Sequence, residues 1–288
     1  MPPAPPSRPA RTRRVRRARR TGLRVAIAGV AVVALAGAVV GLKVLLTPPA
    51  PPVAPGCAVR SGSLTFDLSL DQAANATTIT AVGKRLGLPD HAVTVALAAA
   101  LQESQLHNLN YGDQDSLGLF QQRPSQGWGT AAQVTTPRYA AAAFFEHLAA
   151  VPNWENLPVT VAAQSVQRSG APTAYAQWQS EARALAIAMT GEIPAGLRCQ
   201  YPSLPTNTTT VSLTDTMTGE LGASTLGVAL PAARGWTVAA WLVGHATEFG
   251  ILTVSFDGQA WSAATGTWAT GAVADPVVRI TRAPATPS

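Results

Sequence analysis

The chain has 288 residues, of which 47% are hydrophobic and only 12% are charged. This length allows one medium-sized domain and a smaller one, joined by linkers. The formal net charge of +6 is concentrated at one end, because nine arginines lie within residues 1–24, whereas residues 44–288 carry 11 basic and 15 acidic side chains. Binding to nucleic acids requires a basic face on a folded domain. The charge distribution therefore argues against nucleic acid as a partner.

An apolar segment follows the arginines. Residues 25–46 contain a single charged side chain, Lys43, and about 20 apolar residues span a bilayer as a helix. The basic residues 1–24 predict that the N-terminus stays in the cytoplasm. We therefore expect a single-pass protein of the cell membrane, with residues 1–24 as a cytoplasmic tail, residues 25–46 as a transmembrane helix and the bulk of the chain outside. A cleaved signal peptide is the alternative, and it exports the same bulk of the chain.

Periodicity and turn residues divide the exported part. We expect a Pro-rich linker over residues 47–56, a mainly α domain over 57–200, a second linker over 201–210 and a small α+β module over 211–288. The expected helices of the larger domain cover residues 70–86, 90–106, 137–150, 158–168 and 172–190, with a long polar loop over 107–130. In the module, residues 237–249 predict a helix, and 251–256 and 277–281 predict strands.

The chain contains two cysteines, Cys57 and Cys199. They frame the predicted α domain, and the environment outside the cytoplasm is oxidising, so we expect a disulfide between them. A metal-binding or reactive pair is the alternative, but neither cysteine has a His or Cys neighbour in sequence. The structural interpretation is favoured.

Glu103 is the first candidate for catalysis. It lies near the end of the apolar segment ALAAALQES, so its surroundings should be largely buried. Desolvation favours the protonated form of a carboxyl group, which a general acid needs in order to protonate a glycosidic oxygen. A solvated glutamate at a helix end is the ordinary alternative, and composition alone favours it.

The polar loop supplies further candidates. Asp113 and Asp115 are the acids closest in sequence to Glu103, and glycoside hydrolysis commonly uses two carboxylates. The side chains that could bind a sugar are the amides of Gln121 and Gln122 and the rings of Tyr111 and Trp128. Each has a structural alternative: the aspartates could cap turns, the aromatic rings could belong to the core, and Gln121 could brace the loop.

The spacing of these residues resembles a known pattern. Glu103-Ser104, followed 15 residues after the glutamate by Gly118-Leu119-Phe120-Gln121, is similar to the Glu-Ser … Gly-Leu-Met-Gln pattern of lytic transglycosylases and goose-type lysozymes. The resemblance covers about residues 70–190 and extends to the lysozyme-like domains of actinobacterial exported proteins. It implies a lysozyme-like fold, Glu103 as the catalytic acid, and residues 118–121 as the lining of the sugar cleft. Gly112-Asp113 is similar to the Gly-Asp of the goose-type loop, whose aspartate helps to position water.

The sequence also departs from this pattern. Phe120 stands in place of Met, and Arg123 stands where goose-type enzymes have a further Asp. Transglycosylases carry an Ala-Tyr-Asn-Ala-Gly segment, for which the nearest counterpart here is residues 162–167, AAQSVQ. This segment has no tyrosine, so Gln164 or Gln167 would have to take its place.

The expected function is therefore cleavage of peptidoglycan glycan strands at the outer face of the membrane. The second step would use either the 6-hydroxyl of the sugar, as in a lyase, or water held by Asp113 or Asp115, as in a hydrolase. The alternative is a catalytically inactive protein that binds peptidoglycan or acts as a cell-wall scaffold. We expect no cofactor and no metal, because the histidines at 91, 107, 147 and 245 have no spacing typical of a zinc site.

Overall fold

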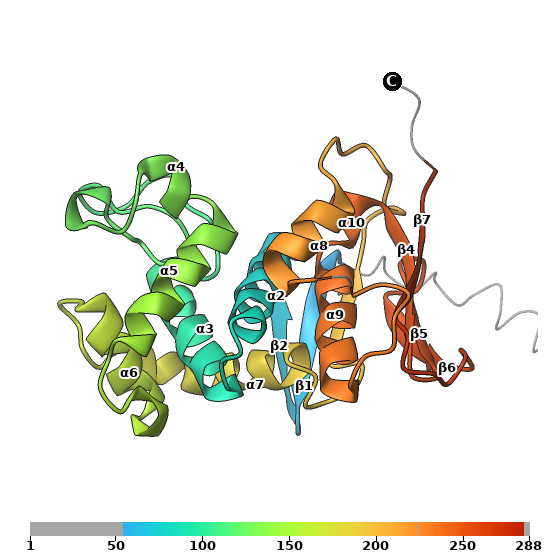
Figure 1. The fold of residues 1–288 in the computed structure, drawn as a ribbon, viewed down its shortest axis with the longest axis horizontal. Coiled ribbons are helices and arrows are strands. Elements are labelled where there is room, and N and C mark those ends of the chain that lie inside the picture. Colours follow the sequence, from blue (N-terminus) through green and yellow to red (C-terminus); the bar gives the residue numbers. More distant parts are fainter. Residues whose placement is uncertain (1–53, 224, 285–288) are drawn as a thin grey trace, which may run out of the picture. The chain divides into compact units, whose positions relative to one another are not determined.

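The computed structural model describes residues 54–223 and 225–284 (Figure 1). The expected transmembrane helix, residues 25–46, lies outside these residues, as do the basic tail and most of the first linker. Within the described part, no helix combines the length and the apolar character that crossing a bilayer would need. The prediction for residues 25–46 stays a prediction.

The expectation of a mainly α, lysozyme-like domain is wrong, because the fold is mixed α and β with two antiparallel sheets. The first sheet has the strand order β2-β1-β3 and consists of β1 (Gly56–Ser61), β2 (Leu64–Leu68) and β3 (Leu197–Gln200). Strands β1 and β2 form a hairpin whose turn contains Gly62, with a φ of +60°. Strand β3 is only four residues long and pairs with a strand that is remote in sequence. Such a short, non-local strand leaves almost no periodic signal in the sequence.

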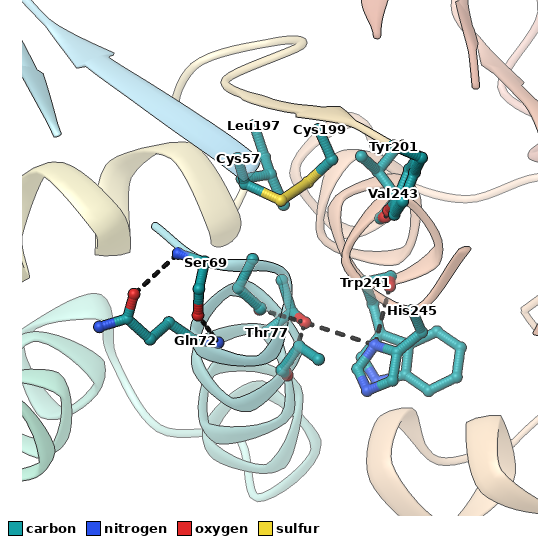
Figure 2. Close-up of a disulfide and its surroundings, with 12 residues drawn as sticks. Cys57, Ser69, Gln72, Thr77, Leu197, Cys199, Tyr201, Trp241, Val243 and His245 are labelled. Carbon is teal, nitrogen blue, oxygen red and sulfur yellow. Dashed lines mark hydrogen bonds between the residues drawn. A yellow bond between two sulfur atoms is a disulfide. The ribbon is translucent and has the colours of Figure 1, made fainter. Parts of the chain in front are cut away.

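This sheet contains the predicted disulfide, which is confirmed. Cys57 of β1 lies directly opposite Cys199 of β3 in the antiparallel register, and the Sγ atoms are bonded with the two Cα atoms 4.0 Å apart (Figure 2). The bond joins residues 142 positions apart. It therefore closes the segment that contains all the candidate site residues.

Helix α2 (Leu70–Arg85) contacts helices from both halves of the described chain, meaning the part up to Gln200 and the part after it. It begins with a capping box in which Ser69 Oγ accepts from the Gln72 N–H and the Gln72 side chain accepts from the Ser69 N–H (Figure 2). It packs against α3 (Asp90–Ser104) and α5 (Pro137–Ala149), and also against α8 (Leu213–Leu221) and α9 (Ala232–Gly244). The helix predicted over residues 70–86 is thus confirmed, and it joins the two halves.

Helix α3 is buried along most of its length. Residues 92–101 are all buried, as expected for a helix that is apolar on every side. The elements around it include α5, α6 (Val159–Gln167), the 3₁₀ segment η3 (Ala174–Trp178) and α7 (Gln179–Met189). The expected helix over residues 172–190 is therefore divided into η3 and α7. The expected loop contains one 3₁₀ turn, η1 (Pro124–Gln126), and is followed by α4 (Ala131–Val134); η2 (Trp154–Asn156) precedes α6.

The second sheet has the order β6-β5-β4-β7, with β4 (Ile251–Phe256), β5 (Gln259–Ser262), β6 (Thr267–Thr270) and β7 (Arg279–Arg282). The strand predicted over residues 251–256 is confirmed, whereas the one over 277–281 is shifted to β7. The helix expected over residues 237–249 begins earlier, after Pro231, and is divided into α9 and α10 (Ala246–Phe249). Trp236, Trp241 and Trp261 are buried, so these rings belong to the core.

The described residues share one hydrophobic core and form one compact unit. Trp268 of β6 donates from Nε1 to the Leu197 carbonyl of β3 at 2.9 Å, which connects the two sheets. The Tyr201 hydroxyl donates to the Val243 carbonyl of α9 (Figure 2). The segment after residue 200 therefore packs directly on the first sheet and on α2.

Candidate active site

Glu103 is the penultimate residue of α3, and its side chain is partly buried. The helix ends because Gln105 and Leu106 adopt left-handed conformations, with φ of 52° and 62°. Two side chains of α2 hold this end: Gln72 Nε2 donates to the Gln105 carbonyl and Asn75 Nδ2 to the Leu106 carbonyl, both at 2.8 Å. These bonds satisfy carbonyl groups that a helix terminus otherwise leaves unpaired. The backbone that carries Glu103 is thus fixed from two directions.

Tyr175 is the direct partner of the Glu103 carboxyl group. Its hydroxyl donates to Glu103 Oε1 at 2.6 Å, and its ring is fully buried. Burial, together with the hydrogen bond to Glu103, raises the pKa of Tyr175 above its ordinary value of 10.0. The hydroxyl therefore keeps its proton at neutral pH and remains a donor to the carboxyl group.

The segment that carries Tyr175 is attached to the end of α3 by further hydrogen bonds. Gln177 Nε2 and Trp178 Nε1 both donate to Gln102 Oε1, at 3.0 and 2.9 Å. Adjacent residues of α3, Gln102 and Glu103, are thus both bound by η3. Because these contacts join positions about 70 residues apart, they position Tyr175 through tertiary packing and not through local sequence.

The strip 118–121 lies beside the same end of α3. Ser104 Oγ donates to the Leu119 carbonyl at 2.8 Å, and Gln167 Nε2 donates to the Phe120 carbonyl at 2.8 Å. Gly118 has a φ of +77°, and a Cβ there would lie 2.1 Å from the Val134 carbonyl oxygen, so this position accepts only glycine. The serine of the Glu-Ser pair therefore joins the two halves of the motif.

The side chains of this strip point in different directions. Those of Leu119 and Phe120 are buried in the core, so these two residues present backbone atoms at most. Gln121 Nε2 donates to the carbonyls of Tyr111 and Gly118, at 3.3 and 3.2 Å. Gln121 thus braces the loop, which is the structural alternative considered from the sequence.

The other candidates for sugar binding differ in exposure. Gln122 is 1% exposed, and its Nε2 donates to the Ala140 carbonyl of α5, so this amide lies in the interior. Tyr111 is 67% exposed. Trp128 is partly buried and stacks on His147 of α5, with the ring centroids 4.0 Å apart. Of these three side chains, Tyr111 is the most accessible.

The two aspartates have separate surroundings. The Asp115 carboxylate accepts hydrogen bonds from Arg123 Nε and from the Ser125 N–H, both at 2.8 Å. The hydrogen bond from Arg123 is the main cause that lowers the pKa of Asp115 to about 2. Asp113 is exposed, and its backbone carbonyl accepts from the Ser116 N–H at 3.0 Å. Asp115 is therefore engaged within the loop by Arg123 and Ser125.

Tyr175 is the site residue that sequence reasoning missed. Gln164 donates to the Ser169 carbonyl and Gln167 to the Phe120 carbonyl, and within the described residues neither is hydrogen-bonded to Glu103. The tyrosine follows the stretch SGAPTA, 72 residues after Glu103. No local pattern in that stretch indicates a partner for the carboxyl group.

Two cavities, of about 430 and 540 Å³, lie elsewhere in the described part of the chain. Neither is lined by Glu103 or by residues 118–121. Over the same residues, no group of three or more His, Cys, Asp and Glu side chains is placed to hold a metal ion. The chemistry available at Glu103 is thus that of a carboxyl group with a tyrosine donor.

No protein-family model matches this sequence, and no curated protein matches it either.

Proposed function

We propose that the chain cleaves the glycan strands of peptidoglycan, with Glu103 as the acid. The observation that carries the proposal is the 2.6 Å hydrogen bond from the buried Tyr175 hydroxyl to Glu103 Oε1. A catalytic carboxyl group must be held in one orientation by neighbouring groups. The similarity of Glu103-Ser104 and residues 118–121 to the motif of lytic transglycosylases supports the same role.

The two carboxyl oxygens of Glu103 have different surroundings and are proposed to have different roles. Tyr175 occupies Oε1, whereas within the described residues no hydrogen bond is made to Oε2. Oε2 would then carry the proton that passes to the glycosidic oxygen between MurNAc and GlcNAc as the bond to the anomeric carbon breaks. The resulting carboxylate can accept a proton from the nucleophile in the second half of the reaction.

Of the two possible second steps, we propose the lyase route. The sugar's own 6-hydroxyl attacks the anomeric carbon and loses its proton to Glu103, so that a 1,6-anhydro product forms without water. This route needs one carboxylate, and Asp115 is already engaged by Arg123 and Ser125. A hydrolase would need a second carboxylate to hold water, for which Asp113 is the remaining candidate.

The proposed place of action is outside the cytoplasm. The disulfide between Cys57 and Cys199 supports this location, because such bonds persist mainly in oxidising compartments. Peptidoglycan is then the substrate that an exported protein would meet.

The test is digestion of purified peptidoglycan by the protein and by its Glu103→Gln variant. We expect wild-type protein to release anhydro-muropeptides, detected by mass spectrometry, and the variant to lose at least about 100-fold of this rate, as is typical when an acid catalyst is removed. Glu146→Gln on α5 is the matched control, because Glu146 is also a helical glutamate but is exposed. Equal product from wild type and Glu103→Gln, or none from wild type, would refute the proposal.

A catalytically inactive wall-binding protein is the second candidate. It is favoured by the engaged state of Asp115, which is bound by Arg123 and Ser125. In that case pull-down by insoluble peptidoglycan should be unchanged in Glu103→Gln, while wild type forms no soluble product. Pull-down that fails for wild type would exclude this candidate too.

A further inference from the structure

A second cluster of polar side chains lies away from Glu103, in the cavity of about 430 Å³. Its lining combines Thr78 of α2, Arg138 of α5, Asp215 and Glu220 of α8, His245 between α9 and α10, and Glu248 of α10. The cavity thus lies where helices from both halves of the described chain meet. Its volume is within the range of small-molecule sites.

Glu220 is the central group of this cavity. The residue is 8% exposed, and both of its donors share one oxygen: Thr78 Oγ1 donates to Oε2 at 2.8 Å and Trp241 Nε1 at 2.7 Å. Within the described residues, Oε1 accepts no hydrogen bond and Glu220 forms no ion pair. A buried carboxylate is costly unless it is paired. One oxygen of Glu220, Oε1, is therefore an acceptor without a donor at the wall of the cavity.

His245 adds a second acceptor to this cluster when its ring is neutral. Its Nδ1 lies 3.0 Å from the Trp241 carbonyl, which can only accept, so Nδ1 carries a proton (Figure 2). Its Nε2 lies 3.3 Å from Thr78 Oγ1. The Thr78 hydroxyl has a single proton, which it can give to Glu220 or to a neutral His245 ring, but not to both. A bound group with several N–H donors would satisfy both acceptors.

The charge of the lining indicates the sign of such a group. Glu220, Asp215 and Glu248 place three carboxylates at the cavity, against the one guanidinium of Arg138. Among the described residues, none of these four side chains forms an ion pair. Arg138 lies instead against the backbone of α8, where a Cβ at Gly219 would be 1.9 Å from Nη1. The lining is therefore net negative and favours a cation.

We propose that this cavity binds a small organic ammonium ion, with Glu220 as the buried counter-charge and Asp215 and Glu248 at the rim. An ammonium group brings up to three N–H donors, which suits the free Oε1 of Glu220. A bare metal ion fits less well, because no three His, Cys, Asp or Glu side chains of the described residues lie close enough together to hold one. This inference is independent of Glu103.

The test is titration of the full-length protein with cadaverine, a five-carbon diamine, in an isothermal titration calorimeter. We expect saturable binding to wild type and at least about tenfold weaker binding to Glu220→Gln, because a charge-assisted hydrogen bond is lost. The amide oxygen of Gln can still accept from Thr78 and Trp241, so the fold should be kept, as circular dichroism would verify. The Glu146→Gln variant, at a position that does not line the cavity, should bind cadaverine as wild type does.

No saturable binding of cadaverine to wild type, or equal affinity in wild type and Glu220→Gln, would overturn the proposal. 1-Pentanol has the same carbon chain with no charge, and binding as strong as that of cadaverine would also contradict it. If Glu220→Gln does not fold, the double variant Asp215→Asn/Glu248→Gln, at two exposed positions, must weaken binding instead. Unchanged affinity for cadaverine in that variant would then contradict the proposal that this cavity is the binding site.

Discussion

At the scale of single residues, Glu103 and Tyr175 form the contact on which the proposed chemistry depends. The tyrosine ring is fully buried, and burial and the neighbouring carboxyl group raise its pKa. A neutral donor at a fixed position orients the carboxyl group without competing for its proton. Tyr175 is thus a positioning residue in this proposal.

We expect Tyr175→Phe to reduce kcat for peptidoglycan cleavage by about tenfold while KM stays unchanged, since the hydrogen bond that orients the catalytic carboxyl group is lost. The ring is retained, so the core should not lose volume. Steady-state kinetics on soluble glycan fragments measures this. Tyr201→Phe is the matched control, because Tyr201 is also a buried tyrosine whose hydroxyl bonds elsewhere, to the Val243 carbonyl. A fall in kcat of the same size in both variants would mean that loss of stability, and not positioning, is the cause.

At the scale of elements, the contact between the end of α3 and the loop at 107–130 joins the two halves of the motif. Ser104 donates to the Leu119 carbonyl across this contact, and Gly118 allows the close approach to Val134. Asp115 and Arg123 brace the outer part of the loop. The loop is thus held by hydrogen bonds along its length, although it contains little regular structure.

Ser104→Ala should lower the free energy of unfolding by about 1–2 kcal/mol, because the buried Leu119 carbonyl loses its donor. Urea denaturation followed by tryptophan fluorescence measures this. Ser165→Ala is the control, since Ser165 Oγ donates to the Val161 carbonyl within an exposed part of α6. Equal stability of the two variants would show that the Ser104 bond does not hold the loop.

At the scale of the whole described unit, α2 and the disulfide join segments that are far apart in sequence. Helix α2 contacts α3 and α5 on the one hand and α8 and α9 on the other. The bond between Cys57 and Cys199 closes the first sheet. Breaking the disulfide or the packing of α2 should therefore lower the stability of the whole described unit.

The double variant Cys57→Ser/Cys199→Ser should be less stable than wild type by about 2–5 kcal/mol, the usual cost of removing a disulfide that closes a long loop. Urea unfolding with and without reductant measures this. Because the chain has two cysteines, reductant should destabilise wild type and leave the double variant unchanged. A reductant effect of equal size on both proteins would contradict the presence of the disulfide between Cys57 and Cys199.

The sequence by itself determined the elements whose signals are local. The helices expected over residues 70–86, 90–106 and 137–150 begin where α2, α3 and α5 begin, and two isolated cysteines were sufficient to predict the bond between Cys57 and Cys199. The apolar run before Glu103 located a buried helix end. These features depend on neighbours within a few residues, and local spacing records them directly.

Only the tertiary structure decided the fold class and the partners of the key carboxyl groups. Strands β1 to β3 are short, and the paired residues Cys57 of β1 and Cys199 of β3 are 142 positions apart, so no periodic pattern revealed the first sheet. Tyr175 reaches Glu103, and Thr78 and Trp241 reach Glu220, through packing between remote helices. A hydrogen bond of this kind depends on where two backbones meet in space, which neither segment encodes alone.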